Sequence, residues 1–195
     1  MKYLYIILMF FSSLLFSQKK EIDSNIILRN KLIKTSLKSY YDKDTLILKK
    51  ANNNLLKLYE KTKDSTILAK HYLFKALFNK ITHNTDSAFQ YYYHSKNISL
   101  LIKDSLSVGC RLLSIANLQR EIKDYLGSEI TSIEALQYLE PIKANEFIVY
   151  IYNNLGIVSK ELNQNNEAIK YYKKALKINN LNTDLQKKKK VIYIL

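Results

Sequence analysis

The sequence predicts an all-α fold, a right-handed solenoid built from antiparallel helix pairs. The chain of 195 residues has only three Gly and one Pro, which argues against a protein rich in hairpins and turns. Compact side chains recur at a constant step of about 40 residues, a size that is typical of stacked helical repeats. Lys-Asp-Ser recurs at the same step, at 63–65 and 103–105.

The small residues predict where helices meet, because two helices pack closely only where one of them lacks side-chain bulk. Within residues 150–180, a first helix contains Gly156 and a second contains two alanines. The corresponding places in the two preceding repeats also have small side chains. We therefore expect the structural positions of the repeat to be Ala76, Ala88, Ala116, Ala135, Gly156, Ala168 and Ala175.

Three helix pairs follow from this register. We expect helices at about 64–82 and 85–101, at 104–122 and 125–139, and at 143–162 and 165–179. Asp64 and Asp104 are predicted to cap first helices, since a short carboxylate can accept from the free amides of a helix start. Asp86 and Asp124 are predicted to cap second helices, and Pro141 to follow a helix end.

The spacing of Leu155-Gly156, Ala168, Tyr172 and Ala175-Leu176 resembles the tetratricopeptide repeat, a helix–turn–helix unit of about 34 residues. The departures are Tyr152, Ser159 and Asn180, where the family often has Trp, Tyr and Pro. Because the period here is longer than that of the family, we expect extra turns in the first helix or in the connection to it. The resemblance implies a concave surface, lined by first helices, that holds peptides.

The flanking segments fit this scheme less closely. Residues 18–61 are predicted to be a linker and a degenerate capping helix pair, because they have apolar sets but no small-residue signature. Residues 62–182 hold the three repeat-like pairs. Residues 183–195 are predicted to begin a further, incomplete repeat. Either the reading frame ends prematurely there, or the last residues form a short solvent-facing capping helix.

The N-terminus is predicted to be a secretory signal peptide, residues 1–17. Lys2 precedes an apolar run from 3 to 16, which is shorter than the roughly 20 residues that a spanning helix needs. The expected cut lies between Ser17 and Gln18, at a junction that resembles those of Bacteroidetes-type bacteria. The mature chain would then be periplasmic or secreted; the alternative is an uncleaved anchor that leaves the chain facing the periplasm.

The formal charge of +14 favours acidic partners, nucleic acid or anionic membrane surfaces. The lysines are scattered, however, and export argues against nucleic-acid binding by this segment. We expect contact with a membrane only through the targeting segment or through a further C-terminal part. A single Cys excludes a disulfide within the chain.

One position of the first helix is cationic in all three repeats and predicts a basic ladder along the concave face. It would suit a peptide with acidic groups or a C-terminal carboxylate, and nearby asparagines could bond the peptide backbone. The alternative is an ordinary solvated helix face, and Leu73 and Leu113 stand where a carboxylate clamp would offer Lys or Asn. The predicted binding residues are Lys80, Asn117, Arg120, Asn153, Asn154 and Lys160.

No catalytic residue, metal site or cofactor is predicted. His71, His83 and His94 are not at metal-ligand spacing, and Cys110 has no legible catalytic partner. The predicted function is an exported protein-interaction scaffold. One alternative is the sensor fragment of a membrane-bound regulator whose kinase or DNA-binding output domain lies outside this chain, and another is a secreted enzyme of unknown type.

Overall fold

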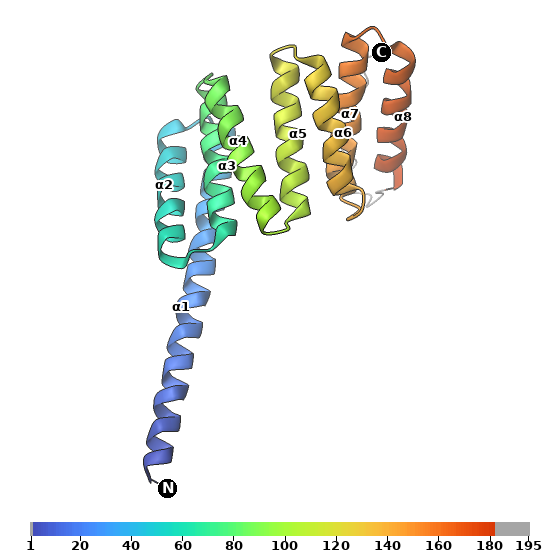
Figure 1. Cartoon of the computed structure of the whole chain (residues 1–195). Helices are drawn as coiled ribbons and strands as arrows, with labels where there is room; N and C mark the ends of the chain where they lie inside the picture. Colours follow the sequence, from blue (N-terminus) through green and yellow to red (C-terminus); the bar gives the residue numbers. More distant parts are fainter. Residues whose placement is uncertain (1, 182–195) are drawn as a thin grey trace.

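The computed structural model describes residues 2–181, and within this range it is all-helical with no strand (Figure 1). All six helices expected between 64 and 179 are present, with ends within two residues of the predicted ones. The fold is an α-solenoid, as the sequence predicted. The helices are α1 (Lys2–Tyr41), α2 (Thr45–Thr62), α3 (Ser65–Ile81), α4 (Thr85–Leu101), α5 (Ser105–Glu121), α6 (Tyr125–Leu139), α7 (Asn145–Glu161) and α8 (Asn165–Leu181).

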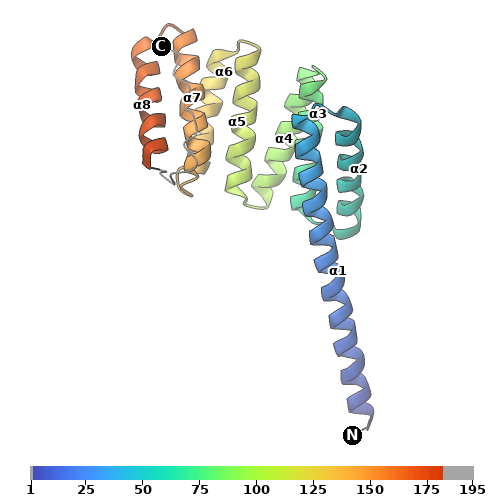
Figure 2. The same ribbon diagram turned by 180° about the vertical axis from the view of Figure 1, so that it is seen from behind.

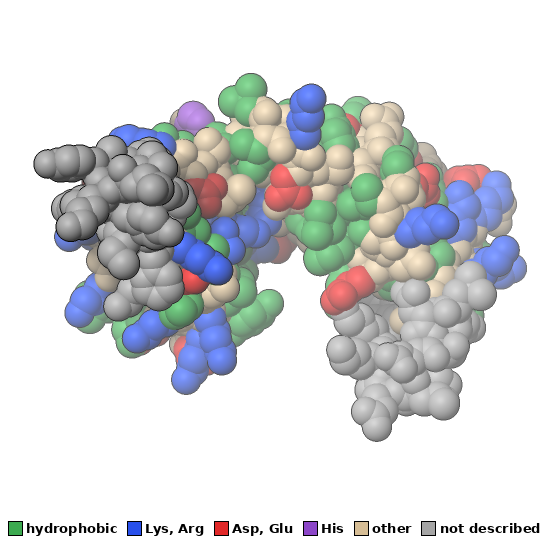
Figure 3. Space-filling model, turned by 90° about the horizontal axis from the view of Figure 1, so that it is seen from below, with side chains coloured by type: hydrophobic (Ala, Val, Ile, Leu, Met, Phe, Trp, Pro, Cys, Tyr) green, Lys and Arg blue, Asp and Glu red, His purple; other side chains and the backbone are tan. Residues whose placement is uncertain are grey.

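Each helix packs against the next, and α2 to α8 stand side by side in chain order (Figures 1 and 2). First helices also contact each other across a repeat, α1 with α3 and α5 with α7. Seen end-on, the described surface curves into an arch with a hollow on its inner side (Figure 3). Side chains of the odd-numbered helices α1, α3, α5 and α7 line a cavity that we assign to this inner side.

The turns show that the unit of the solenoid is one helix with its turn, half of the step seen in the small residues. In each turn a residue with a side chain adopts a left-handed backbone with φ between 52° and 66°, and these residues recur at a constant interval. Helices α3, α4, α5, α7 and α8 each have 17 residues. The left-handed residues are Lys43, Lys63, His83, Lys103, Lys123, Lys143 and Asn163.

This geometry corrects one expectation. Extra turns were expected in the first helix or in the connection to it, but both helices of a repeat have nearly the same length, and short turns such as 82–84 and 102–104 join them. The additional length is therefore shared by the two helices. The reason is the left-handed residue, which ends each helix at the same point and reverses the chain in a single step.

Helix N-termini recur with the same spacing. The side chains of Asp44, Asp64, Asn84, Asp104 and Asp124 each accept a hydrogen bond from an amide of the first turn, at 2.8–3.2 Å. The predicted caps Asp64, Asp104 and Asp124 are thus confirmed. The prediction for Asp86 is wrong: this residue lies inside the first turn of α4, and Asn84 is the cap because it immediately precedes the helix.

The small residues of the repeat lie in the tight contacts between helices. The five alanines at 76, 88, 116, 135 and 175 are 0% exposed, and Ala168 is 5% exposed. Gly156 is buried too, and a Cβ atom added to it would come within 2.5 Å of the Tyr172 ring. A larger side chain at any of these positions would push two helices apart.

The core is a series of local clusters. One cluster joins α1, α2 and α3 around Leu55 and Phe74, and another joins α3, α4 and α5 around Tyr92 and Ile115. A third, around Ile151 and Leu155, joins the last two pairs. Each cluster is shared by neighbouring helices only, so the stability of such an array is close to a sum of neighbour terms.

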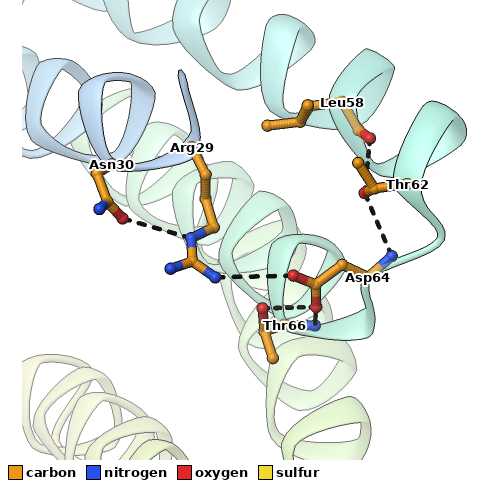
Figure 4. Close-up of polar contacts among 6 residues, drawn as sticks. All are labelled: Arg29, Asn30, Leu58, Thr62, Asp64 and Thr66. Carbon is orange, nitrogen blue, oxygen red and sulfur yellow. Dashed lines mark hydrogen bonds and ion pairs between the residues drawn. The ribbon is translucent and has the colours of Figure 1, made fainter. Parts of the chain in front are cut away.

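Besides the apolar cluster, a polar contact at Asp64, at the start of α3, links the first pair to the array (Figure 4). Its carboxylate accepts from the Thr66 amide at 2.8 Å and the Thr66 hydroxyl at 2.7 Å, and it pairs with Arg29 of α1 at 3.7 Å. One side chain therefore caps α3 and holds α1 against it.

Helix α1 is continuous from Lys2 to Tyr41, so the predicted cleavage point and the predicted linker both fall within a helix. Cleavage after residue 17 remains a prediction. Among residues 2–181, no helix is long and apolar enough to cross a membrane. The further repeat predicted at 183–195 lies outside the described residues.

Candidate functional site

The inner side of the arch contains a cavity of ≈ 430 Å³, which we call the concave groove. Four successive first helices, α1, α3, α5 and α7, contribute side chains to it. Figure 3 shows the hollow of the arch, with Lys and Arg side chains set back in it beside hydrophobic ones. The lining residues are Leu37, Tyr40, Tyr41, Lys70, Leu73, Leu77, Leu106, Ser107, Cys110, Arg111, Leu113, Ser114, Asn117, Phe147 and Tyr150.

Most of this lining is apolar. Leu73 and Leu113 are 7% and 8% exposed, and they occupy the positions where a carboxylate clamp would carry Lys or Asn. Aromatic rings of Tyr40 and Phe147 stand on the α1 and α7 sides. The groove can therefore remove apolar side chains of a ligand from water, the interaction that contributes most of the affinity in such sites.

Two cations lie in this apolar setting. Arg111 is only 7% exposed, and its Nε atom is buried with no hydrogen-bond partner within residues 2–181. Lys70 of α3 is half-buried. Burial, and after it the neighbouring Arg111 charge, lowers the pKa of Lys70 below its ordinary value.

Asp104, the cap of α5, is an acid whose charge acts on both Lys70 and Arg111. Burial acts to raise its pKa, but hydrogen bonds from the hydroxyl and amide of Ser107 and the positive charges of Lys70 and Arg111 act to lower it, and the pKa lies below its ordinary value. Asp104 is thus an anion that offsets part of the cationic charge. No ion pair joins it to either cation in the part of the chain that the structure describes.

Cys110 lies in the same lining, half-buried. Burial raises the pKa of its thiol, although Arg111 and Lys70 act in the opposite direction. A thiol with a raised pKa holds its proton at neutral pH and is a weak nucleophile. Cys110 therefore contributes a small, soft surface to the groove.

The cations of the predicted ladder lie elsewhere, and two of them have partners. Lys80 Nζ pairs with Glu121 Oε1 at 2.7 Å, between α3 and α5. Arg120 Nε donates to Asn154 Oδ1 at 2.7 Å, between α5 and α7. Lys160 is exposed near the end of α7. Lys80 and Arg120 thus link first helices of neighbouring repeats, and these contacts give each of them a role in holding the repeats together.

The three predicted asparagines have different surroundings. Asn154 is 3% exposed, and its Nδ2 donates to Ser128 Oγ at 2.9 Å and Ser132 Oγ at 3.0 Å, so its polar atoms are used in packing. Asn153 is half-buried, with an Oδ1 that has no partner among the described residues. Asn117 lines the concave groove. Of the six predicted binding residues, only Asn117 belongs to this lining.

Sequence reasoning missed Arg111 and Lys70. The predicted ladder assumes a cation at one position that recurs in every repeat, whereas Lys70 and Arg111 occupy two adjacent positions of the repeat. A signal was nevertheless present: Arg111 is a charged residue between Cys110 and Leu112, in a helix whose other residues there are apolar or small. A charge in such a place is either paired inside the protein or serves a ligand.

The histidines His71 and His94 belong to packing contacts. His71 Nδ1 lies 3.2 Å from the backbone oxygen of Asn52, and burial lowers the pKa of this imidazole. His94 packs on Tyr72 at 5.1 Å between ring centroids, and Tyr72 in turn stacks on Tyr91. Among residues 2–181, no three His, Cys, Asp or Glu side chains are grouped so that they could hold a metal ion.

Residues 149–180, the α7–α8 pair, match the family model described as tetratricopeptide repeat. The α7–α8 pair is therefore similar to one tetratricopeptide repeat. Repeats of this kind are protein-interaction scaffolds that have no catalytic role of their own.

Among solved structures, the chain is similar to the crystal structure of BtubC (BKLC) from P. vanneervenii. The TM-score is 0.62 at 16% sequence identity, and the match covers 85% of this chain and 76% of that one. At this identity the similarity shows a shared fold. No curated protein matches the chain.

Proposed function

We propose that this tetratricopeptide-repeat chain is an exported scaffold that holds a peptide or a segment of a partner domain in the concave groove. The observation that carries the proposal is the groove itself: a cavity of ≈ 430 Å³ that four successive first helices line. Cavities of about 300–1,000 Å³ with apolar walls and a few polar groups are the usual size and character of ligand sites.

The lining supports a peptide as the ligand. Apolar walls stand beside polar groups at Ser107, Ser114 and Asn117, all on α5. An extended peptide likewise offers both apolar side chains and backbone donors and acceptors. A protein ligand also agrees with the general role of the family.

Export is the second part of the proposal. It is supported by Lys2, by the apolar run from 3 to 16 and by the polar turn at 17–20. Expression in a bacterium with a periplasm, followed by fractionation and mass measurement, tests it. We expect a periplasmic chain that begins at Gln18; an intact chain recovered from the cytosol would contradict export.

Peptide binding is tested by selecting displayed random peptides on the full chain. A photo-crosslinking amino acid is then placed at Asn117, in the groove, or at Ile130, which is 68% exposed on α6 outside the lining. We expect selected peptides to crosslink to position 117 and not to position 130. Crosslinking at 130 alone, or selected peptides that crosslink at neither place, would refute binding in the groove.

A further inference from the structure

Helix α6 has an exposed apolar stripe that lies outside the concave groove. Leu126, Ile130 and Ile133 are 62%, 68% and 44% exposed, whereas Ala135 and Leu139 of the same helix are fully buried. The three exposed residues follow each other at intervals of four and three, so they lie on one face of the helix. No residue of α6 is among those that line the groove. Apolar side chains grouped on a surface in this way are typical of sites that bind another molecule.

The charges beside this stripe are unusual for so basic a chain. Helix α6 is the one helix among α1 to α8 that contains no Lys or Arg, although the whole sequence has 31 such residues. Its charged residues are Glu129 and Glu134, which lie on either side of the stripe by the 3.6-residue period. Glu134 pairs with Lys96 of α4 at 3.8 Å, and its side chain is still 41% exposed. The face of α6 is therefore both apolar and acidic.

Helix α8 has the opposite character at the corresponding positions. One repeat of 40 residues further on, Ile130 and Ile133 correspond to Lys170 and Lys173, and Lys177 lies one turn beyond. All three lysines are exposed, and no ion pair joins Lys173 or Lys177 to an acid within residues 2–181. Because successive repeats of a solenoid are equivalent, the basic face of α8 and the apolar face of α6 point to the same side of the array.

The two faces are also close to each other. Burial, and after it the charge of Glu129 on α6, raises the pKa of Tyr171 on α8. A single surface thus presents an apolar, acidic half and a basic half. Such a surface is complementary to itself, because each half has the character that the other half needs in a partner.

We propose that this combined face of α6 and α8 binds a second copy of the chain, with α6 of each copy packed against α8 of the other. The long stems of the α8 lysines would cover the aliphatic side chains of α6, and their ammonium groups would reach Glu129 and Glu134. The dimer goes beyond the proposed function and does not depend on it. Because no groove residue belongs to this face, both concave grooves would stay open in the dimer.

Charge selects this arrangement from the two that a two-fold axis allows. An axis across the helices would place α8 on α8 and bring the lysines of both copies together. An axis along the helices, between α6 and α8, places each acidic face on a basic one. Like charges that meet across an interface are costly, so the second arrangement is the favoured one.

The acids also favour a second copy over a membrane. Lysines beside aliphatic side chains suit an anionic bilayer, but anionic headgroups would repel Glu129 and Glu134. In the dimer the same carboxylates gain basic partners. The face comprises only two helices of each copy, so we expect a reversible dimer and not a permanent one.

Photo-crosslinking tests where the copies meet. The full chain has a photo-crosslinking amino acid at Ile130 or, as a control, at Gln90, the corresponding exposed residue of α4. We expect position 130 to link two chains, with the linked peptide inside α8 (Asn165–Leu181), and position 90 to link none. A link from position 130 to α6 of the other chain, equal linking from both positions, or no linking would overturn the arrangement.

Exchange of the charges gives a second test. One variant combines Glu129→Lys with Glu134→Lys, and the other combines Lys173→Glu with Lys177→Glu. Each variant alone places like charges at both α6–α8 contacts, so its dissociation constant, measured by sedimentation velocity, should rise about tenfold or more. An equal mixture of the two variants has opposite charges at both contacts, and in it the dimer should return.

A matched control makes the same change of charge elsewhere. Lys50→Glu with Lys57→Glu alters two exposed lysines of α2 and should leave the dissociation constant unchanged. Should a variant lose its helical circular dichroism, crosslinking from position 130 decides the test.

Three results of sedimentation would overturn the dimer. They are a native chain that is monomeric at every concentration, a mixture of the two variants that stays dissociated, and an association that neither variant weakens. The last result would indicate contact through another part of the chain, such as the apolar run from 3 to 16. A monomeric chain that binds vesicles containing phosphatidylglycerol would assign the face to a membrane instead.

Discussion

Among helices α2 to α7, only α7 begins without a side-chain cap, at Ala144, and adding a cap there should stabilise the protein. Helices α2 to α6 begin with Asp or Asn bonded to an amide of the first turn, at 2.8–3.2 Å, whereas Ala144 at the start of α7 makes no such side-chain bond. Its φ of −74° and ψ of 58° are close to the −78° and 73° of the capping residue Asp124. The backbone is therefore already in place for a capping carboxylate.

The expected gain for Ala144→Asp is about 1 kcal/mol, since replacing a native capping residue by Ala typically costs that much. For a chain of this size the melting temperature should rise by about 2–4 °C. The measurement is equilibrium urea unfolding followed by circular dichroism. Hydrogen exchange of the α7 amides checks it, because repeat arrays can unfold in parts.

Two variants control this prediction. Ala144→Asn offers the same acceptor without charge and should keep most of the gain, which separates capping from repulsion by the acidic Glu146 of the first turn. Asp124→Ala should lose about 1 kcal/mol. The reasoning is refuted if Asp124→Ala destabilises as expected while neither variant at 144 has any effect.

Three further predictions concern the helices and turns. Ala135→Leu should destabilise the chain by about 1–3 kcal/mol through overpacking, whereas Gln137→Leu, exposed on the same helix, should not; thermal unfolding compares them. Lys123→Gly should stabilise by about 0.5–1 kcal/mol in urea, because Gly adopts φ of 66° without strain, while Lys173→Gly inside α8 should lose about 1 kcal/mol. Because the folded pKa of Asp104 is depressed, its stabilisation is present above the unfolded value of 3.8 and is lost as pH falls through the folded pKa. Asp104→Asn should therefore differ most from the native chain above about pH 5, and an unfolding free energy difference independent of pH would contradict this.

The fold could be predicted from the sequence because its signals are local and periodic. Ala116 and Gly156 mark close contacts wherever a helix pair forms, and Asp64 and Asp104 mark helix starts through their own side chains. The shorter repeat, one helix with its turn, is equally visible in Lys43-Asp44 and Lys123-Asp124. A comparison of whole helix pairs, 40 residues apart, does not reveal it.

The site was harder to predict, because it depends on how each helix is rotated against the next. Lys80 and Arg120 occupy one position of the repeat, yet the first pairs with the carboxylate of Glu121 and the second with the amide of Asn154. Those partners depend on the stacking angle, which no single repeat encodes. Arg111 is outside the periodic pattern altogether, so a search by period could not find it.

From Lys43 on, the equal length of the helix-plus-turn segments limits how such a protein can change in size. Loss of a single segment would preserve the phase of all later turns but would exchange the inner and outer faces of everything downstream. Residues of the outer surface would then face the hollow, and groove residues would face the solvent. Gain or loss of whole helix pairs leaves the groove residues on the concave side. Insertions and deletions in this architecture should therefore be tolerated in multiples of two helices.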